Sequence, residues 1–277
     1  MKQVRNALCM FLLFLAPSLI ALSSLPAPIR QQALNDLNQW LAEARDDAIT
    51  LINQARETAS SLKGDTFLKA SLKATCHLSA YRKSHGPLPP NTRGVLTSLS
   101  KDLRSHFLNR YLLFYDLLLV SPKGEVVFSI RQERDLGINL LHPPWTDTPL
   151  GQSLHNRQQP QTVDFQAYPP TGEASAFFVQ PVHEDGRFEG WLILQLTINH
   201  LNQTLASPRG KGQTGEVLLV NRDRFLLTES RFETQGGILS QQLPHANIEI
   251  KFRERAGWRE VVDYRGQPVL SAFEVLP

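Results

Sequence analysis

Apolar residues recur every three or four positions over a long stretch near the start of the chain. Between residues 30 and 62 this stripe consists of Leu34, Leu37, Leu41, Ala44, Ala48, Leu51, Ala55, Ala59 and Leu62. The spacing is that of one face of an α-helix, and charged residues occupy mostly the other faces. A helix of about 30 residues is about 45–50 Å long. The stripe can pack on the helix's own domain or form the seam of a homodimer, and the sequence leaves both open.

The pattern then changes from helices to strands. Residues 66–84 predict one or two short helices, 84–94 a proline-rich loop and 95–110 a further helix. Short runs rich in β-branched and aromatic residues follow, which predicts strands. These runs are the hairpin 117–130 and the segments 162–168, 174–182 and 190–198, with a short helix expected at 148–156. Five strands joined by turns predict an antiparallel sheet.

Part of this strand pattern is repeated about a hundred positions later. The hairpin "LLLVSPKGEVVFS" at 117–129 resembles "VLLVNRDRFLLTES" at 217–230. Strands are again expected at 259–264 and 269–277, and the second of these contains Ser-Ala-Phe at 271–273, as the first copy does at 175–177. The repeat predicts two similar antiparallel sheets in tandem.

The second copy is shorter than the first, because nothing after Pro277 corresponds to the strand 190–198. A sheet that lacks a strand exposes a row of unpaired backbone groups, which is unfavourable. We therefore expect the sequence to be truncated, with a further apolar strand and a second membrane helix beyond residue 277. The predicted fold class is α+β: a long N-terminal helix followed by two antiparallel-sheet subdomains, the second without its last strand.

The N-terminus carries a targeting signal. Residues 6–29 contain no charge, and Lys2 and Arg5 precede them. About 20 apolar residues cross a bilayer, and positive charge ahead of such a span stays in the cytoplasm. An uncleaved anchor is favoured over a cleaved signal peptide, although "ALSSLPA" offers small residues for a peptidase. Either way, residues 30–277 are expected outside the cytoplasm, in the periplasm or extracellular space, at the inner (plasma) membrane.

Composition and charge exclude several classes of protein. The formal net charge of the 277 residues is +3, and basic residues are scattered among acidic ones, so no nucleic-acid partner is expected. Cys9 lies in the apolar run and Cys76 stands alone, which argues against a disulfide scaffold. Cys76 is expected to be a buried or idle thiol, or else to bond to a second subunit.

No motif of catalysis or metal binding is convincing. The eight histidines lack the close spacing of a zinc or iron site. "GQSLH" at 151–155 lacks the second glycine of a nucleophile elbow, and "RGKGQTGE" at 209–216 is better explained as a linker than as a phosphate loop. Acidic residues show no paired arrangement for acid–base catalysis. We therefore expect no enzyme activity, no cofactor and no metal in this region.

Three long phrases resemble the double Cache family, the tandem PAS-like sensor domains of bacterial membrane receptors. They are "VDFQAYPPTGEASAFFVQPVHEDGRFEGWLILQLTI" (163–198), "GQTGEVLLVNRDRFLLTESRF" (212–232) and "VVDYRGQPVLSAF" (261–273), and the resemblance covers roughly residues 30–277. It implies an extracytoplasmic ligand-sensing module on a stalk helix. In the family such a module precedes a second membrane helix and a cytoplasmic histidine kinase, cyclase or chemoreceptor output, which these residues do not contain.

The resemblance also implies that the ligand sits in the membrane-distal unit, here residues 111–200. The amino-acid-binding branch of the family has an Arg-x-x-Trp-Tyr pattern and an acidic residue on the last strand of that unit. Here Trp145 has no tyrosine after it and no arginine three positions before it, and the closing strand offers Gln195. The resemblance therefore does not extend to amino-acid binding.

A pocket in a PAS-like unit lies between the concave sheet face and the segment that crosses it, and is mostly apolar with a few polar groups. Arg131 could pair with a ligand carboxylate, or lie solvated at a strand end. Tyr168 could line the pocket or close its strand by packing, and Trp145 is more typical of a lid or core plug than of a ligand stacker. The candidate ligand-binding residues are Tyr115, Arg131, Trp145, His155, Tyr168, Phe177 and Gln195.

The sequence thus predicts four parts. They are a membrane anchor or signal at 1–29, a stalk helix with short helices at 30–110, a membrane-distal subdomain at 111–205 and a truncated membrane-proximal subdomain at 206–277. The expected function is small-molecule sensing by a membrane-bound receptor, which passes the signal through the stalk helix. A stand-alone exported module that binds a solute or a protein is the alternative.

Overall fold

The computed structural model describes residues 13–14, 16–17, 26–205, 215–221, 223–230, 232, 238–240, 242–243 and 254–276. The chain divides into two compact units. The first unit, Gln54–Thr197, contains the first copy of the repeated hairpin, and the second unit consists of Met1–Asn53 with Ile198–Pro277. The two units are described separately, and the predicted boundaries at 110 and 205 stay a prediction.

The predicted stalk helix is present as α1, Ala27–Ser60, and ends in a 3₁₀ turn, η2, at Ser61–Gly64. Its apolar stripe is buried within this chain from Leu37 to Leu62. Packing against the chain's own residues accounts for the stripe, and a dimer contact stays a prediction. In the second unit, Arg45 Nη1 of α1 also forms an ion pair with Glu274 Oε2 at 3.2 Å.

Two further helices belong to the first unit. Helix α2 is a single helix, Thr66–His85, and Asp65 caps its N-terminus by accepting a hydrogen bond from the Leu68 N–H at 3.0 Å. Helix α3 spans Pro90–Arg110 and starts five residues before the predicted helix. The difference arises because Pro90 occupies the first helical turn, where a missing N–H costs nothing.

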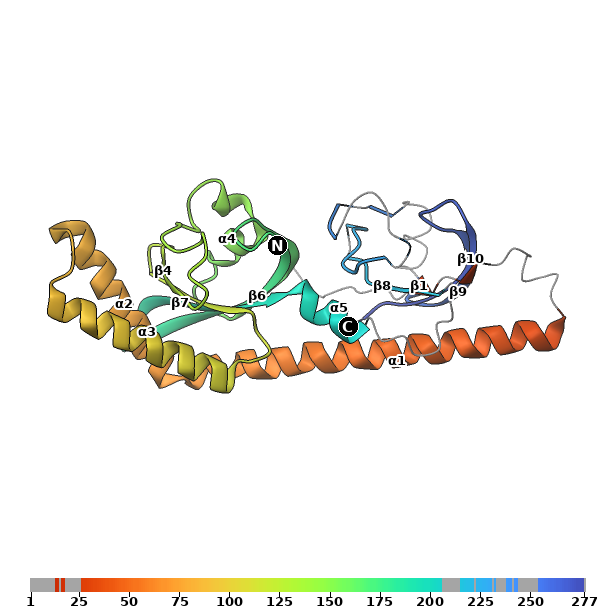
Figure 1. The fold of residues 1–277 in the computed structure, drawn as a ribbon, viewed down its shortest axis with the longest axis horizontal. Coiled ribbons are helices and arrows are strands. Elements are labelled where there is room, and N and C mark those ends of the chain that lie inside the picture. The colour runs from red at the N-terminus through yellow and green to blue at the C-terminus, as the bar shows by residue number, and fades with distance from the viewer. Residues whose placement is uncertain are drawn as a thin grey trace. The chain divides into compact units, whose positions relative to one another are not determined.

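The sheet of the first unit has five antiparallel strands, as predicted. They are β3 (Asp116–Val120), β4 (Val126–Ser129), β5 (Gln161–Tyr168), β6 (Glu173–Glu184) and β7 (Arg187–Thr197), in the spatial order β4-β3-β7-β6-β5. Figure 1 shows α2 and α3 on one side of this sheet, while α4 (Pro149–Ser153), which follows the 3₁₀ turn η3 (Trp145–Asp147), lies on the other.

The second unit contains two small antiparallel sheets among its described residues. One consists of β8 (Val217–Leu218) with β1 (Leu13–Phe14), and the other of β9 (Ala256–Val262) and β10 (Pro268–Glu274) with β2 (Ala16–Pro17). Helix α5 (Ile198–Leu205) precedes β8. Val220 forms an antiparallel bridge with Leu226, as Val120 pairs with Val126 in the first unit. The α+β class and the repeated sheet predicted from the sequence are thus confirmed.

In the part of the N-terminal apolar segment that precedes Pro26, four residues are described, and they form strands. Strand β1, Leu13–Phe14, pairs with β8, and β2, Ala16–Pro17, pairs with β10. At these four positions a strand replaces the predicted membrane helix. The rest of the anchor predicted for residues 6–29 lies outside the described residues up to Leu25. Across the described part of the chain, we find no helix with the length and apolar character needed to span a bilayer.

Candidate functional site

The two faces of the first sheet have different partners, because successive residues of a strand point to opposite sides. One face belongs to an apolar cluster that includes Ile193, Phe177 and Trp191, and the residues between β4 and β5 complete it. On the other face, Phe178 packs edge-on against Phe114 at 5.5 Å between ring centroids. Neighbouring residues of β6 therefore contact opposite layers of the unit.

A group of buried and half-buried polar residues lies at one end of the first of these faces. We call it the Asp135 cluster and define it as Asp116, Glu133, Asp135, Gln166, Tyr168, Ser175 and Gln195. Asp116, Asp135, Ser175 and Gln195 are fully buried, and Tyr168 is 2% exposed. The Tyr168 hydroxyl donates to Asp135 Oδ2 at 3.1 Å, and Gln195 Nε2 donates to Ser175 Oγ at 2.9 Å.

The strands place these residues together by register. Gln195 of β7 is opposite Asp116 of β3 on one side and opposite Phe177 of β6 on the other. Gln166 of β5 is opposite Ser175. Residues that pair across antiparallel strands share a face, so four strands contribute to one cluster.

Burial changes the acidity of the cluster. It raises the pKa of Asp116 to about 6, although hydrogen bonds from Ser129 and from the Leu117 N–H oppose this shift. Burial also raises the pKa of Asp135; the Tyr168 hydroxyl lowers it, and the charge of Glu133 raises it further. Carboxyl groups with raised pKa values in one buried place are typical of functional sites.

Several buried polar atoms of the cluster have no hydrogen-bond partner among the described residues. Three are acceptors, namely Asp135 Oδ1, Glu133 Oε2 and Gln195 Oε1, and one is a donor, Gln166 Nε2. A buried polar group without a partner costs about 1–3 kcal/mol. Such atoms are few in native proteins, and each calls for a physical reason. A ligand that donates hydrogen bonds would provide partners for these three acceptors.

The second unit provides an internal comparison. There Glu216 holds the place of Asp116, directly before the strand, and is 1% exposed. Its carboxylate accepts hydrogen bonds from the hydroxyls of Tyr264 and Ser230, the latter at 2.9 Å. Both carboxylate oxygens of Glu216 are therefore paired within the protein. Both oxygens of Asp116, the equivalent carboxylate of the first unit, are paired as well, and the unpaired acceptors of that unit lie on Asp135, Glu133 and Gln195.

The structure brings together some of the residues predicted to bind ligand. Tyr168, Phe177 and Gln195 are buried in or against the cluster, and the Tyr168 ring packs against Phe177 at 4.9 Å between centroids. Trp145 is half-buried and packs edge-on against Tyr168 at 5.7 Å. These positions suit ligand contact, but ligand binding by these residues stays a prediction.

The other three predicted residues lie outside the buried cluster. Arg131 is exposed; its guanidinium stacks on the Tyr115 ring at 4.5 Å, and Nε donates to the Tyr115 carbonyl at 3.1 Å. The half-buried Tyr115 donates its hydroxyl to Glu133 Oε1 at 2.5 Å, and this hydrogen bond, with burial, raises the pKa of Tyr115 to about 12. His155 is exposed after α4.

The buried carboxylates are not among the residues predicted from the sequence to bind ligand. Asp116 and Asp135 are fully buried, which composition alone does not reveal. A signal was present for Asp116, because "YDLLLV" and "GEVLLV" both place an acidic residue directly before the apolar run. For Asp135 no such signal exists, because it lies on the irregular segment between β4 and β5, whose path only the tertiary structure defines.

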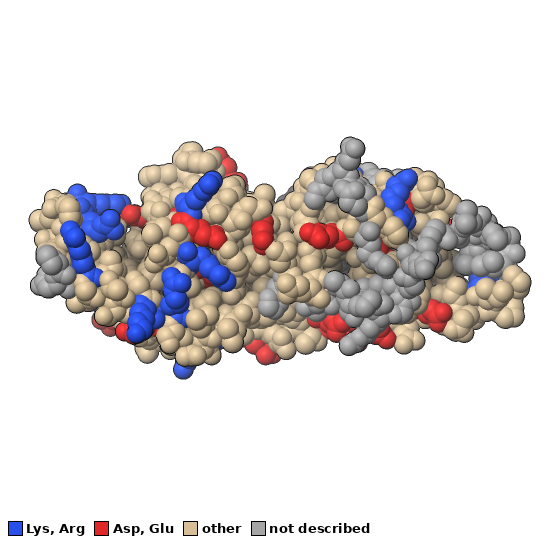
Figure 2. All heavy atoms as spheres, viewed as in Figure 1, with Lys and Arg blue, Asp and Glu red and all other residues tan. Residues whose placement is uncertain are grey.

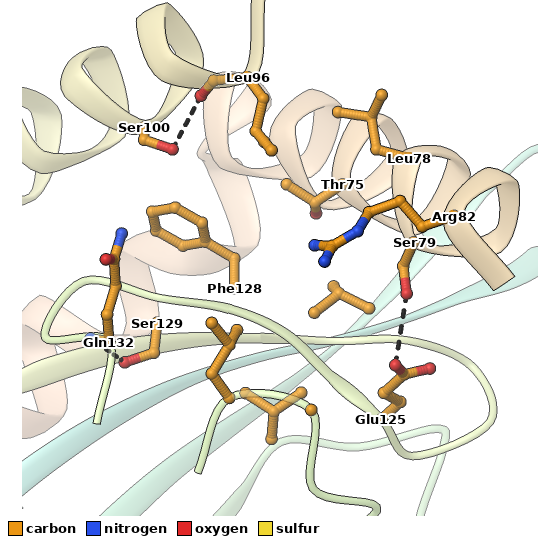
Figure 3. Close-up of a pocket in the computed structure, with 14 residues that line it drawn as sticks. Thr75, Leu78, Ser79, Arg82, Leu96, Ser100, Glu125, Phe128, Ser129 and Gln132 are labelled. Carbon is orange, nitrogen blue, oxygen red and sulfur yellow. Dashed lines mark hydrogen bonds between the residues drawn. The ribbon is translucent and has the colours of Figure 1, made fainter. Parts of the chain in front are cut away.

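A separate pocket of about 180 Å³ lies on the opposite side of β4. Helices α2 and α3 form its walls, and Figure 3 shows Phe128 of β4, Leu96 of α3 and the side chain of Arg82 from α2 around it. It contains none of the predicted ligand-binding residues. On the face of the molecule drawn in Figure 2, acidic and basic side chains are interspersed over the described residues.

Comparisons with known proteins bear on the fold. No protein-family model and no curated protein sequence matches this chain. Among solved structures, the extracellular domain of the histidine kinase vpHK1S-Z8 is 13% identical and aligns with a TM-score of 0.54 over 91% of this chain and 96% of its own. The sensor domain of the V. cholerae histidine kinase DctB is 12% identical, with a TM-score of 0.53 over 90% and 99%. The chain has the Cache-type sensor fold.

A further similar structure is longer than this chain. An extracellular ligand binding receptor from Desulfohalobium retbaense is 14% identical, with a TM-score of 0.44, and aligns with 79% of this chain. The chain spans only 39% of that receptor's length. At these identities the similarity shows a shared fold, as the resemblance in sequence predicted, and the ligand has to be argued from the residues themselves.

Proposed function

We propose that this chain is the extracytoplasmic sensor region of a membrane-bound signalling receptor. Its first unit binds a small molecule at the Asp135 cluster. The observation that carries the proposal is the set of buried, unpaired acceptors on Asp135, Glu133 and Gln195 within a Cache-type fold. No catalytic step is required of these residues.

The chemistry of the cluster limits the ligand class. Two carboxyl groups and an amide oxygen offer acceptors, while Tyr168 and Trp145 offer aromatic rings beside them. A protonated amine fits such a place, because it donates up to three hydrogen bonds and is attracted to carboxylates and to aromatic faces. The unpaired Gln166 Nε2 suits an acceptor group, such as a hydroxyl or carbonyl, on the same ligand. The ligand class is therefore small cations with a neighbouring acceptor.

The signal would leave the site through the sheet. Phe177 contacts Tyr168 at the cluster, and the next residue, Phe178, lines a groove with Ala59 and Leu62 at the end of α1 and in η2. A shift of β6 toward a ligand therefore also moves a residue that faces the stalk helix. Such a shift requires different ligand affinities in two states, and couplings of about 1–3 kcal/mol are typical. The output domain and the membrane anchor are part of the proposal.

The test is ligand binding to the full chain. We expect small primary amines to raise the melting temperature, because they bind only the folded state. Alcohols and carboxylic acids of the same size should leave it unchanged. If no amine in such a panel binds while a neutral or anionic compound does, the assignment of ligand class is wrong.

A matched pair of variants locates the site. Gln195→Leu removes an acceptor of the cluster, whereas Gln180→Leu changes a buried glutamine of the neighbouring strand that lines the groove on the other face. We expect Gln195→Leu to weaken amine binding at least about tenfold, which corresponds to about 1.4 kcal/mol. Gln180→Leu should leave affinity unchanged. Equal effects of the two variants would place the ligand elsewhere.

Transmission of the signal from the cluster to α1 can be measured separately from ligand binding. Amide hydrogen exchange with and without the bound amine should show protection in β6 and at Ala55–Leu62, as well as at the cluster. Protection confined to the cluster would argue against transmission through α1 and would favour the stand-alone binding module.

A further inference from the structure

The pocket on the helix side of β4 has a chemistry different from that of the Asp135 cluster. Its volume is about 180 Å³, and helices α2 and α3, strand β4 and the segment after β4 line it. We call it the Arg82 pocket and define it by the six side chains on which its chemistry depends, which are Leu78, Arg82, Leu96, Glu125, Phe128 and Leu136. None of the six belongs to the Asp135 cluster.

An irregularity of β4 turns an aromatic ring into this pocket. Leu119 of β3 is opposite Phe128, whereas Val120 is opposite Val126, so Val127 is an extra residue in β4. Residues two apart on a regular strand share a face, and a β-bulge changes this relation. Val126 belongs to the apolar cluster on the other face, but the Phe128 ring points toward α3 in Figure 3. The bulge therefore supplies the floor of the Arg82 pocket.

The walls of the pocket are mostly apolar and are open to solvent. Leu78 of α2 and Leu96 of α3 are half-buried, and Leu136 is 48% exposed. An apolar cavity of about 150 Å³ holds a molecule of benzene, so this pocket has room for a group of about that size. Removing apolar surface from water is favourable. The walls therefore suit an apolar group no larger than a benzene ring.

Arg82 gives the pocket a positive charge without a partner. Figure 3 shows its guanidinium pointing from α2 into the pocket, and among the described residues it has neither a hydrogen bond nor an ion pair. The carboxylate of Glu125 is already occupied, because Oε1 accepts a hydrogen bond from Ser79 Oγ at 3.3 Å and Oε2 forms an ion pair with Lys83. A guanidinium binds a carboxylate through two parallel hydrogen bonds. The charge of the pocket therefore suits an anion.

We propose that the Arg82 pocket is a second ligand site and that it binds a monocarboxylate whose apolar part is about the size of a benzene ring. The carboxylate lies on Arg82, and the apolar part lies over Phe128. The inference goes beyond the proposed sensor function, because it places a ligand of opposite charge on the other side of β4. A carboxylate as small as acetate leaves the apolar walls uncovered, and we do not expect it to bind.

Three compounds test the ligand class by titration calorimetry with the full chain. Benzoate carries the ring and the charge, benzyl alcohol carries the ring with a neutral group, and acetate carries the charge without a ring. We expect benzoate to bind at least about tenfold more tightly than either of the others. Equal affinity for benzyl alcohol would exclude a role for the charge of Arg82, and equal affinity for acetate would exclude a role for the apolar walls. No binding of benzoate would overturn the proposal.

A charge-matched pair of variants locates the carboxylate. Arg82→Gln removes the guanidinium from the pocket, whereas Arg104→Gln removes the same charge from an exposed position of α3 outside it. We expect Arg82→Gln to weaken benzoate binding at least about tenfold and Arg104→Gln to leave it unchanged. Equal effects of the two variants would place benzoate elsewhere and would overturn the proposal.

A second pair changes the space in the pocket and keeps Arg82. Ser100 of α3 lines the pocket, and its hydroxyl donates only to the Leu96 carbonyl of the same helix, at 2.8 Å. Ser100→Leu should therefore fill part of the pocket and abolish benzoate binding, whereas Ser105→Leu, at an exposed position of the same helix, should not. Benzoate binding to a folded Ser100→Leu variant with unchanged affinity would overturn the proposal. If Ser100→Leu does not fold, the Arg82→Gln pair decides, because Arg82 is exposed and its side chain has no partner to lose.

Failure of this inference and failure of the sensor proposal are distinguishable. Benzoate binding and the Arg82→Gln variant report on the Arg82 pocket, whereas amine binding and the Gln195→Leu variant report on the Asp135 cluster. Loss of either ligand in the variant of the other site would show that the two sites are not separate.

Discussion

Asp116 and Glu216 hold equivalent positions in two repeated sheets, and each buried carboxylate accepts a hydrogen bond from a serine hydroxyl. The distances are 2.7 Å from Ser129 Oγ to Asp116 Oδ2 and 2.9 Å from Ser230 Oγ to Glu216 Oε2. The backbone repeats as well: Gly124 and Arg224, at equivalent places in the two hairpin turns, both have positive φ, +85° and +70°. Both units therefore hold a buried, hydrogen-bonded carboxylate at the equivalent position.

The buried Asp116 should make stability depend on pH. Its pKa in the folded protein is about 6, above the ordinary 3.8, so the native state binds the proton more tightly than the unfolded chain. The free energy of unfolding should then fall as the pH rises from about 4 to about 6, by up to about 3 kcal/mol from this group. Asp116→Asn should remove this dependence, which denaturant unfolding at several pH values would measure. Asp102→Asn, an exposed change on α3, is the control and should keep it. The difference between the wild-type and the Asp116→Asn free energies of unfolding should therefore fall over this pH range. A difference that rises would contradict the raised pKa of Asp116.

Tyr168 links the candidate site to the sheet. Tyr168→Phe removes the hydroxyl that donates to Asp135 and leaves that buried carboxyl with one fewer partner. We expect a loss of about 1–3 kcal/mol in the free energy of unfolding. Tyr81→Phe, at a 40% exposed tyrosine of α2, should change stability by less than about 0.5 kcal/mol. Equal stabilities of the two variants would mean that the Tyr168 hydroxyl contributes nothing.

Asp65 links helices α2 and α3 of the first unit. It caps α2, and its Oδ2 also accepts hydrogen bonds from Tyr111 at 2.8 Å and from His106 at 2.6 Å. Asp65→Ala should therefore cost about 2–3 kcal/mol, more than a cap alone, because it also removes the acceptor of the Tyr111 hydroxyl, which keeps only the 3.4 Å hydrogen bond from Ser61 Oγ. Thermal or denaturant unfolding would measure this, with Asp102→Ala as the exposed control. A cost no larger than that of the control would rule out this role.

The same residue gives a pH dependence of the opposite sign. Burial alone would raise the pKa of Asp65, but hydrogen bonds from His106, the Leu68 N–H and Tyr111 bring it below its ordinary 3.8. Its contribution to stability is therefore present above about pH 4 and is lost as the pH falls through the lowered value. Acid unfolding should start at a higher pH in a variant whose His106 is replaced by Phe.

Gly190 permits a close approach of two central strands. Its φ is +127°, and a Cβ at this position would collide with the backbone carbonyl oxygen of Val120. Gly190→Ala should thus cost several kcal/mol, since backbone rather than a flexible side chain has to move. Gly186→Ala, in the same hairpin with φ +76° and open space around it, should cost only about 1 kcal/mol from backbone strain. Denaturation midpoints of the two variants provide the comparison; similar midpoints would show that the Val120 contact is relieved easily.

Local sequence patterns determined the elements of this protein. Three- and four-residue spacing predicted α1 and α2, and short apolar runs between turns predicted all five strands of the first sheet, because burial on one face imposes a period on neighbouring residues. The repeat around Leu118 and Leu218 also predicted two similar sheets. These are properties of adjacent residues, which a sequence displays directly.

Only the tertiary structure decided which polar groups meet. Asp135 reaches Tyr168 because the irregular segment after β4 crosses the sheet, and Gln195 lies opposite Asp116 because of strand register. Leu13, Phe14, Ala16 and Pro17 belong to a segment whose composition predicts a membrane span, yet Leu13 and Phe14 pair with β8, and Ala16 and Pro17 pair with β10. An apolar segment can be buried equally well in lipid or in a sheet, so its sequence cannot choose between them. The choice depends on whether the sheet offers unpaired strands, and that is a property of the whole fold.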